Sequence, residues 1–94
     1  MMDYTIAQTL CHRKFKRRFG VERKTFQQIM EVLAPLWRPH PQPGAKPKLG
    51  LADRVLLTLE YWREYRTYFH IGSSWGVSES TVCRIVHWVE DALI

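Results

Sequence analysis

The chain has 94 residues, of which 46% are hydrophobic and 24% charged, a composition typical of a globular domain rather than a disordered chain. This length argues against a two-domain enzyme, because domains commonly run to about 50–200 residues. Fourteen Lys and Arg against nine Asp and Glu give a net charge of +5, which favours an anionic partner, either nucleic acid or an acidic surface.

The charge is unevenly distributed along the chain. Residues 1–48 carry ten basic against three acidic side chains, a net charge of +7, whereas residues 49–94 carry four against six, a net charge of −2. If the partner is DNA, the attraction to phosphates should come mainly from the first half. Deletion of residues 1–48 should then lower affinity more than specificity.

Several kinds of site have no counterpart in the sequence. Cys11 and Cys83 are 72 positions apart and the four histidines are scattered, so there is no zinc-ligand spacing. There is also no glycine-rich phosphate loop, no apolar run of the ~20 residues that a membrane span needs, and no secretory signal. We therefore expect no metal, cofactor, catalytic residue, small-molecule substrate or membrane partner, and two reduced cytosolic thiols.

The first half of the chain predicts two helices. A short apolar stripe surrounded by basic residues ends at Phe19, and Gly20 is a suitable C-terminal stop. A second stripe, spaced as in a helix, consists of Phe26, Ile29, Met30, Leu33 and Trp37. Pro35 should end or kink this second helix near Leu33–Ala34.

All five prolines lie between residues 35 and 47. Because proline lacks the backbone donor and clashes with the preceding turn, residues 38–50 cannot form a helix interior and predict an extended linker. The chain therefore divides into a basic helical arm at 1–37, this Pro-rich linker at 38–50, and a second helical unit at 51–94.

The second unit predicts three helices. The first, at 51–64, has an apolar face formed by Leu51, Ala52, Val55, Leu56, Leu59 and Trp62. Thr67 is a plausible N-cap for a short helix at 68–75, and Ser78 can cap a third helix. The buried face of that third helix would consist of Val82, Ile85, Val86, Val89 and Leu93. The β-branched residues are too sparse and too helically spaced for a sheet, so the expected fold class is all-α.

Residues 68–85 have the spacing of a helix-turn-helix motif. Gly72 supplies a small residue where two helices cross, and Gly76, four positions later, is free to adopt the positive φ that opens the turn. The apolar residues that would lock the second helix onto the first are Val77, Val82 and Ile85. These constraints together predict a three-helix, homeodomain-like unit preceded by the two-helix basic arm.

With that face buried, the opposite face of the third helix is the candidate DNA-reading surface, since the second helix of such a motif lies in the major groove. The base-reading candidates are Ser78, Glu79, Ser80, Cys83, Arg84 and His87. Arg84 could donate two hydrogen bonds to guanine, and Glu79 could accept one from cytosine. Equally, Arg84 could be a solvated charge paired with Glu79 or Asp91, Glu79 could only stabilise the helix N-terminus, and His87 could be an ordinary surface histidine.

Candidate phosphate contacts lie around this surface and in the arm. They are Arg66, Thr67, Tyr68 and Thr81 in the second unit, and Arg13, Lys14, Lys16, Arg17 and Arg18 in the arm. Basic and hydroxyl side chains of this kind position a protein on DNA without reading its sequence.

The run from Leu57 to Arg84 resembles the helix-turn-helix domain of DDE-superfamily transposases from bacterial insertion sequences, in the insertion-sequence-five group. The most specific part is the block from Tyr65–Phe69 to Ser78–Cys83. The arm is similar to the N-terminal region of the same proteins in the segments Phe15–Val21, Thr25–Phe26 and Met30–Leu33. One departure is Glu22, where the family often has Ser or Thr as a helix cap.

In that family the N-terminal domain binds terminal inverted repeats, and a separate RNase-H-like domain cuts and joins DNA with three metal-binding carboxylates. The resemblance implies the first role here, as part of a truncated or split transposase. Since the chain stops at Ile94, we expect no catalytic domain and no enzymatic activity. The expected partner is double-stranded DNA at the element ends, in the bacterial cytoplasm at the nucleoid, with a second copy or a transposase catalytic domain as a further partner.

Two other functions stay open from the sequence. The aromatic residues of the arm, with an exposed Trp37 or Trp88, could form a dimerisation or domain-docking surface, because the third helix carries only one basic residue in its reading face. A helix-turn-helix transcription regulator, such as a sigma-like region, is the other alternative. The transposase-like block argues against the regulator.

Overall fold

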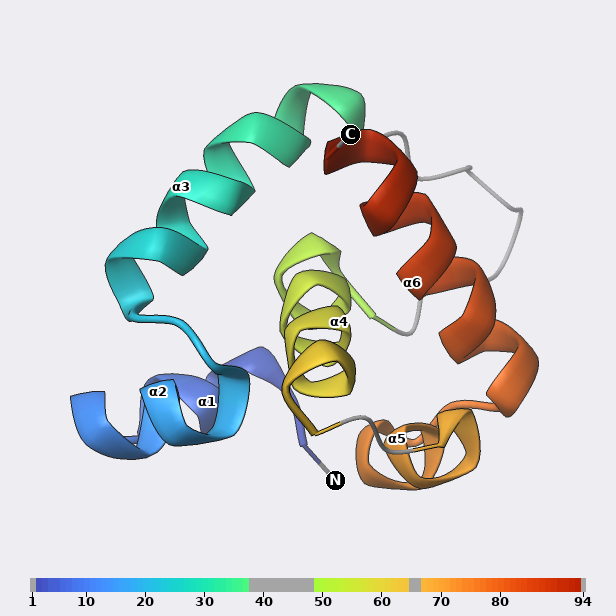
Figure 1. Ribbon diagram of the computed structural model, residues 1–94, viewed down its shortest axis with the longest axis horizontal. Coiled ribbons are helices and arrows are strands. Elements are labelled where there is room, and N and C mark those ends of the chain that lie inside the picture. The colour runs from blue at the N-terminus through green and yellow to red at the C-terminus, as the bar shows by residue number, and fades with distance from the viewer. Residues whose placement is uncertain (1, 38–48, 65–66, 94) are drawn as a thin grey trace.

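The computed structural model describes residues 2–37, 49–64 and 67–93, and all regular structure in these ranges is helical (Figure 1). The all-α prediction is confirmed. The helices are α1 (Tyr4–Gln8), α2 (His12–Phe19), α3 (Arg23–Leu33), the 3-10 helix η1 (Ala34–Leu36), α4 (Leu51–Glu64), α5 (Tyr68–Trp75) and α6 (Glu79–Leu93). Of the Pro-rich linker expected at 38–50, residues 38–48 lie outside the described residues. None of the described helices is long and apolar enough to cross a membrane.

The three helices expected in the second unit are present with the expected bounds. α4 and α5 span 51–64 and 68–75 as predicted, and α6 begins directly after Ser78. The Thr67 hydroxyl accepts a hydrogen bond from the backbone N–H of His70, and the Ser78 hydroxyl accepts one from the N–H of Thr81. Both side chains thus satisfy backbone donors that a helix N-terminus would otherwise leave unpaired.

The arm contains one helix more than the sequence predicted. α1 has only five residues, too few to show a helical apolar repeat, and it is capped by Asp3, which accepts from the backbone N–H of Ile6 at 2.8 Å. The other two arm helices follow the prediction. α2 ends at Gly20, which has a positive φ of 78°, and α3 ends at Leu33, where the chain continues into η1 around Pro35.

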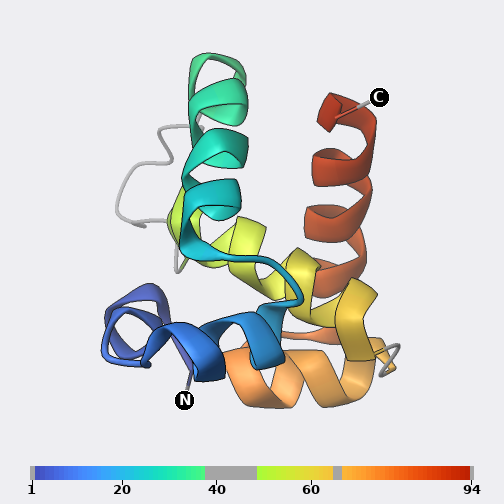
Figure 2. The same ribbon diagram turned by 60° about the vertical axis from the view of Figure 1, so that its left-hand side comes forward.

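Helix α4 lies at the centre of the molecule. α3 and α6 stand on either side of it, while α1, α2 and α5 lie along the lower side of the molecule in Figures 1 and 2. Both halves of the chain therefore pack on the same helix: α2 and α3 of the arm contact α4, as do α5 and α6.

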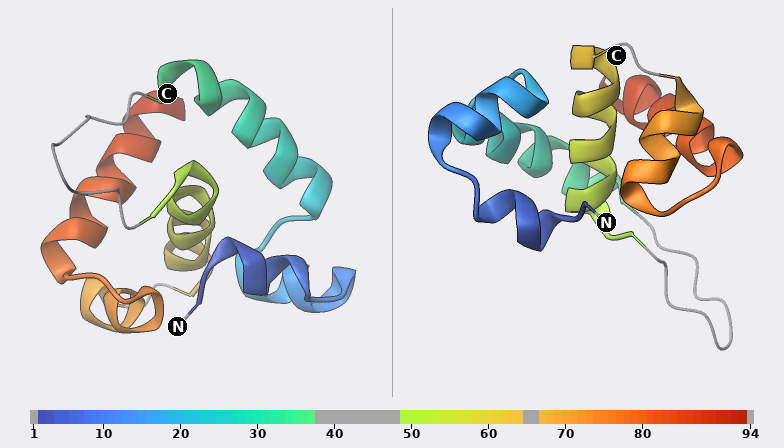
Figure 3. Two further views of the ribbon diagram at one scale, coloured as in Figure 1. Left: turned by 180° about the vertical axis from the view of Figure 1, so that it is seen from behind. Right: turned by 90° about the horizontal axis from the view of Figure 1, so that it is seen from below.

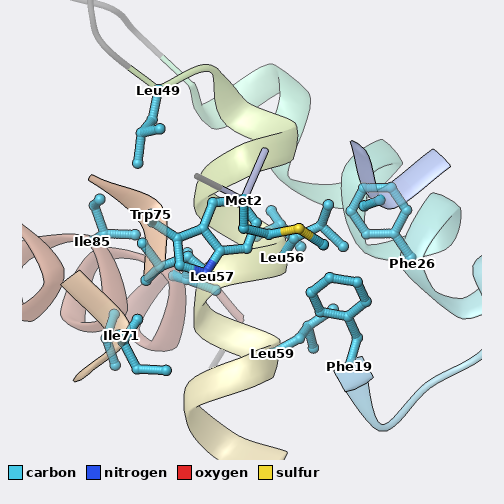
Figure 4. Close-up of a cluster of buried hydrophobic side chains, with 14 of the residues drawn as sticks. Met2, Phe19, Phe26, Leu49, Leu56, Leu57, Leu59, Ile71, Trp75 and Ile85 are labelled. Atoms are coloured by element: carbon cyan, nitrogen blue, oxygen red, sulfur yellow. The ribbon is translucent and has the colours of Figure 1, made fainter. Parts of the chain in front are cut away.

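Because of this central position, more residues of α4 are buried than its predicted apolar face contains. Six consecutive residues, from Val55 to Glu60, are buried. The sequence pattern accounts for Val55, Leu56 and Leu59 on one face but leaves out Leu57 and the polar residues between them. Figure 4 shows side chains from both halves of the chain gathered around α4, including Phe19 and Phe26 from the arm, Ile71 and Trp75 from α5, and Ile85 from α6.

Backbone and side-chain hydrogen bonds tie the N-terminal segment to the second unit. The Asp53 carboxylate accepts from the backbone N–H of Tyr4 at 2.6 Å and from that of Gly50 at 3.1 Å. The backbone N–H of Met2 donates to the Ser74 carbonyl at 2.8 Å. The arm is therefore joined to the second unit by polar contacts as well as by apolar packing.

Candidate nucleic-acid interface

The geometry of the turn between α5 and α6 confirms the helix-turn-helix prediction. Gly76 has φ 72° and ψ 32°, a left-handed conformation that favours glycine. The backbone N–H of Val77 donates to the Gly72 carbonyl at 2.9 Å, and a Cβ added at Gly72 would lie 2.5 Å from the Val77 carbonyl oxygen. The two helices can approach this closely only because position 72 has no side chain.

Helix α6 has one buried and one exposed face, as expected from its sequence. Val82, Ile85, Val86 and Val89 are buried against the core. The expectation for Leu93 is wrong, since this side chain is 38% exposed. It is the last residue of α6. Of the base-reading candidates, five are exposed and Cys83 is partly buried; the exposed ones are Ser78, Glu79, Ser80, Arg84 and His87.

A cluster of hydroxyl groups marks the N-terminal end of this exposed face. The Ser78 oxygen lies 3.1 Å from that of Ser80 and 2.9 Å from that of Thr81, and Thr81 is partly buried. Each hydroxyl can rotate to donate or accept, so together they can satisfy either kind of group on a base or a phosphate. Glu79 adds a carboxylate in the same turn of the helix.

The remaining polar residues of the exposed face continue along α6. Among the described residues, Arg84 forms no ion pair, so neither Glu79 nor Asp91 neutralises its guanidinium. The Cys83 sulfur lies 3.8 Å from Nδ1 of His87, one helical turn further on. The two side chains thus form a pair next to Arg84.

The start of α5 borders this face through Tyr68. Its ring stacks on that of Tyr61 with centroids 4.9 Å apart. A hydrogen bond with Tyr61, together with burial and the nearby Cys83, raises the pKa of Tyr68 to about 12, so its hydroxyl is protonated at neutral pH. Thr67 is exposed, and its hydroxyl lies 2.9 Å from Nδ1 of His70. Arg66, the third candidate at this helix start, lies outside the described residues.

Helix α2 presents a cationic outer surface. Phe15 and Phe19 are buried, whereas the charged groups of its outer face are exposed and belong to Arg13, Lys14, Lys16 and Arg17. Lys16 forms a long, exposed ion pair with Glu22 at 3.8 Å, a type of pair that contributes little stability. Cys11 precedes α2, and a hydrogen bond from the backbone N–H of Lys14 lowers the pKa of its exposed thiol.

Arg18 differs from the other candidate phosphate contacts of the arm. Its guanidinium lies 2.7 Å from Oε1 of Glu60, whose side chain is only 5% exposed, and Oε2 of Glu60 accepts from the indole N–H of Trp75 at 2.8 Å. Arg18, Glu60 and Trp75 therefore form a polar bridge from α2 through α4 to the last residue of α5. The charge of Arg18 is therefore paired inside the protein, while its side chain is 38% exposed.

Two arginines have positions that the sequence analysis did not assign. Arg23 donates to the carbonyls of Ala7, Gln8 and Leu10, which lie at and just beyond the end of α1, and its role is structural. Arg63, near the end of α4, is exposed and lies against Gly20 of α2. Only the packing of α2 on α4 brings Arg63 to the arm, so no local pattern could have indicated it.

The proposed aromatic docking surface is not supported by the positions of the two tryptophans. Trp37 and Trp88 are partly buried and meet edge to face with centroids 5.8 Å apart. The guanidinium of Arg54 lies 4.7 Å from the centre of the Trp37 ring, and burial lowers the pKa of this arginine. The tryptophans thus contact each other rather than standing exposed.

Comparison with known proteins agrees with the motif. Residues 47–94 match the family described as the helix-turn-helix of DDE superfamily endonuclease. Over 88 residues, 94% of its length, the chain is 50% identical to a probable transposase for insertion sequence element IS702 from Microchaete diplosiphon, and it spans 32% of that relative. No solved structure matches. The chain belongs to the helix-turn-helix family of DDE-superfamily insertion-sequence transposases.

Proposed function

We propose that this chain binds double-stranded DNA through α6 and that its target is the terminal inverted repeats of an insertion sequence. The observation that carries the proposal is the exposed polar face of α6. The opposite face of this helix is buried, and Gly72 allows the helix to cross α5 at close distance. A helix held in this way can enter the major groove with its N-terminal half and present polar groups to base edges.

Each group on this face has a role that matches its chemistry. Arg84, which has no internal counter-charge among the described residues, is the candidate for a bidentate contact to guanine. Glu79 can accept from cytosine, and Ser78 and Ser80 can contact either kind of base. Cys83 and His87 extend the reading face along the helix. Thr67, Tyr68 and Thr81 border it and are proposed phosphate contacts, together with Arg66.

In the proposed binding, the arm adds an electrostatic attraction to DNA that does not depend on the DNA sequence. The exposed cations of α2 attract phosphates wherever they lie along the duplex, and they compensate for a second unit whose net charge is −2. Because this attraction acts through released counterions, it weakens as the salt concentration rises.

Catalysis is not part of the proposed role of these residues. The chain spans 32% of the matched relative, and we leave the cutting and joining of DNA to the RNase-H-like domain that the family resemblance implies. The proposed role is to bind the element ends at the bacterial nucleoid. The chain would do so alone, together with a second copy, or together with a transposase catalytic domain.

A mobility-shift titration tests this function. The probes are duplexes carrying the terminal repeats that flank the gene and scrambled duplexes of the same composition, each at several salt concentrations. We expect at least about a thousandfold preference for the repeats and weaker binding at higher salt. A preference near one would overturn sequence recognition, and binding that does not change with salt would overturn the electrostatic contribution of the arm.

A further inference from the structure

Four cationic side chains converge in a groove between α2 and α4. Arg13, Lys16 and Arg17 of α2 line it together with Arg63 of α4 and the backbone of Gly20, and the hollow they surround has a volume of about 480 Å³. All four cationic residues are exposed. No acidic residue lines this α2/α4 groove, although Glu22 reaches Lys16 from outside it.

The close contact between Gly20 and Arg63 creates this groove. A Cβ added at Gly20 would lie 3.0 Å from Cδ of Arg63, so the aliphatic part of the Arg63 side chain packs directly on the backbone at the end of α2. Long basic side chains commonly bury their stems in this way and leave the charged end in water. The packing therefore directs the Arg63 charge to the surface that carries the α2 cations.

The groove and the start of α5, which leads into α6, lie at the same end of α4. α2 and α5 flank the C-terminal end of α4, as Figures 1 and 3 show from two directions. On another side of α4 from Arg63, Tyr61 stacks on Tyr68 at the start of α5, and Tyr68 in turn lies beside Cys83 of α6. The C-terminal end of α4 thus carries the groove on one side and the contacts that lead to α6 on another.

The bridge formed by Arg18, Glu60 and Trp75 joins the helix that carries the groove cations to the helix-turn-helix. It links α2 to the last residue of α5, directly before the turn into α6. A groove on a mobile arm would give only diffuse attraction. Here the charges stay at one position relative to the helix that reads the bases.

We infer that the α2/α4 groove binds the phosphate backbone of the same duplex that α6 reads, and that Arg63 is one of its phosphate contacts. The inference rests on the proposed DNA-binding function and adds to it a second contact with the same duplex, made by the groove. Charge complementarity selects the partner, since duplex DNA offers a regular row of phosphates to four cations. The longest extent of the molecule is 40 Å, so the two contacts lie at most slightly more than one helical turn of duplex, ~35 Å, apart.

The test compares Arg63→Gln with Lys24→Gln, which removes the same charge from an exposed residue in the first turn of α3, outside the groove. The probe is a duplex of about 40 base pairs, roughly four helical turns, enriched from a random-sequence pool by the wild-type chain. Binding is measured by fluorescence anisotropy between about 50 and 200 mM salt, and the contacted backbone is mapped by hydroxyl-radical footprinting.

The logarithm of the binding constant falls linearly with the logarithm of the salt concentration, and removal of one phosphate contact should make this salt slope shallower by about 0.9. Over this fourfold range of salt, the affinity then falls about 3.5-fold less than that of the wild-type chain. Arg63→Gln should show this change and lose protection on one flank, while protection at the α6 site is retained. Lys24→Gln should leave both unchanged, and Arg63→Lys, which keeps the charge, should restore most of the slope.

The outcomes separate the inference from the function on which it rests. If the wild-type chain prefers its selected duplex but Arg63→Gln keeps the wild-type slope and footprint, the groove contact is overturned and DNA recognition by α6 stands. Equal effects of Arg63→Gln and Lys24→Gln would also overturn it, because net charge alone would then explain the loss. If no duplex is enriched, the proposed function itself fails.

Discussion

Gly72 occupies the point where α5 and α6 cross, and the structure leaves no space for a side chain there. A Cβ would lie 2.5 Å from the Val77 carbonyl oxygen, a backbone atom that cannot move without opening the turn. Gly72→Ala should therefore lower the free energy of unfolding by about 1–3 kcal/mol, the usual cost of overpacking. Urea denaturation followed by circular dichroism measures the change.

Gly50→Ala is the matched control for that substitution. A Cβ at position 50 would lie 3.8 Å from the nearest atom, an oxygen of Asp53, which is an ordinary van der Waals contact. Because Gly50 directly precedes α4, where alanine is less favourable than glycine, its effect on unfolding should stay below about 1 kcal/mol. Equal effects at the two glycines would contradict the close crossing of α5 and α6.

Glu60 is the buried residue on which the polar bridge depends. Gln at this position keeps the size of the side chain but removes the charge that Arg18 and Trp75 contact. Since hydrogen bonds to charged groups contribute about 1.5–3 kcal/mol, Glu60→Gln should destabilise the fold by an amount of this order, reduced by the partial exposure of Arg18. Thermal and urea unfolding measure it.

The control for Glu60 lies one turn further along the same helix. Glu64 is exposed, and Glu64→Gln removes the same charge without touching the bridge. A loss for Glu64→Gln as large as that for Glu60→Gln would show that the bridge contributes no stability of its own.

At the residue scale, the exposure of side chains on α6 was predictable from the sequence except for Leu93, but pairing was not. The helical repeat correctly separated the buried valines of α6 from its polar face. The role of Arg18 could not be found, because it depends on Glu60, which is distant in the sequence and reaches Arg18 only when α2 packs on α4. Arg63 was missed for the same reason, since its neighbour Gly20 belongs to another helix.

At the scale of single helices, local signals were strong wherever a helix is amphipathic and capped. The caps at Thr67 and Ser78 and the stop at Gly20 all have the predicted geometry. Two features lay beyond such signals. α1 is too short to show a repeat, and α4 is buried on more than one side, so its single apolar stripe understated its burial.

The cap of α6 yields a prediction at this scale. Ser78→Ala removes the acceptor for the N–H of Thr81 and should cost about 1 kcal/mol of stability, whereas Ser78→Gly should cost only a few tenths, because glycine is tolerated at an N-cap. Chemical denaturation distinguishes the two variants. If alanine and glycine are equally tolerated, the Ser78 hydroxyl does not stabilise the helix start, and its only role would be toward DNA.

For the whole molecule, the structure shows which experiment can test the contribution of the basic arm to DNA binding. Deletion of residues 1–48 was expected to reduce affinity more than specificity. However, the arm contributes Phe15, Phe19 and Phe26 to the common core and holds Arg18 against Glu60. Deletion would remove apolar packing together with charge, so single charge substitutions are the cleaner test of the electrostatic term.

The same packing predicts the behaviour of the second unit alone. A fragment of residues 49–94 would expose Leu57 and leave Glu60 without its partner, so it should unfold at a lower denaturant concentration and with a broader transition than the full chain. Circular dichroism of both, at equal concentration, measures this. A fragment that unfolds as cooperatively and as late as the full chain would contradict a shared core.

The proposal that α6 reads DNA is tested most directly by the specificity of Arg84→Ala. The quantity to measure is the ratio of Kd for scrambled duplex to Kd for terminal-repeat duplex, at one salt concentration, for this variant and the wild-type chain. A lost bidentate contact should lower the ratio by about 5- to 150-fold, corresponding to about 1–3 kcal/mol, with little change in binding to scrambled DNA. A ratio that Arg84→Ala leaves unchanged, or a parallel loss on both duplexes, would contradict base reading by this residue on α6.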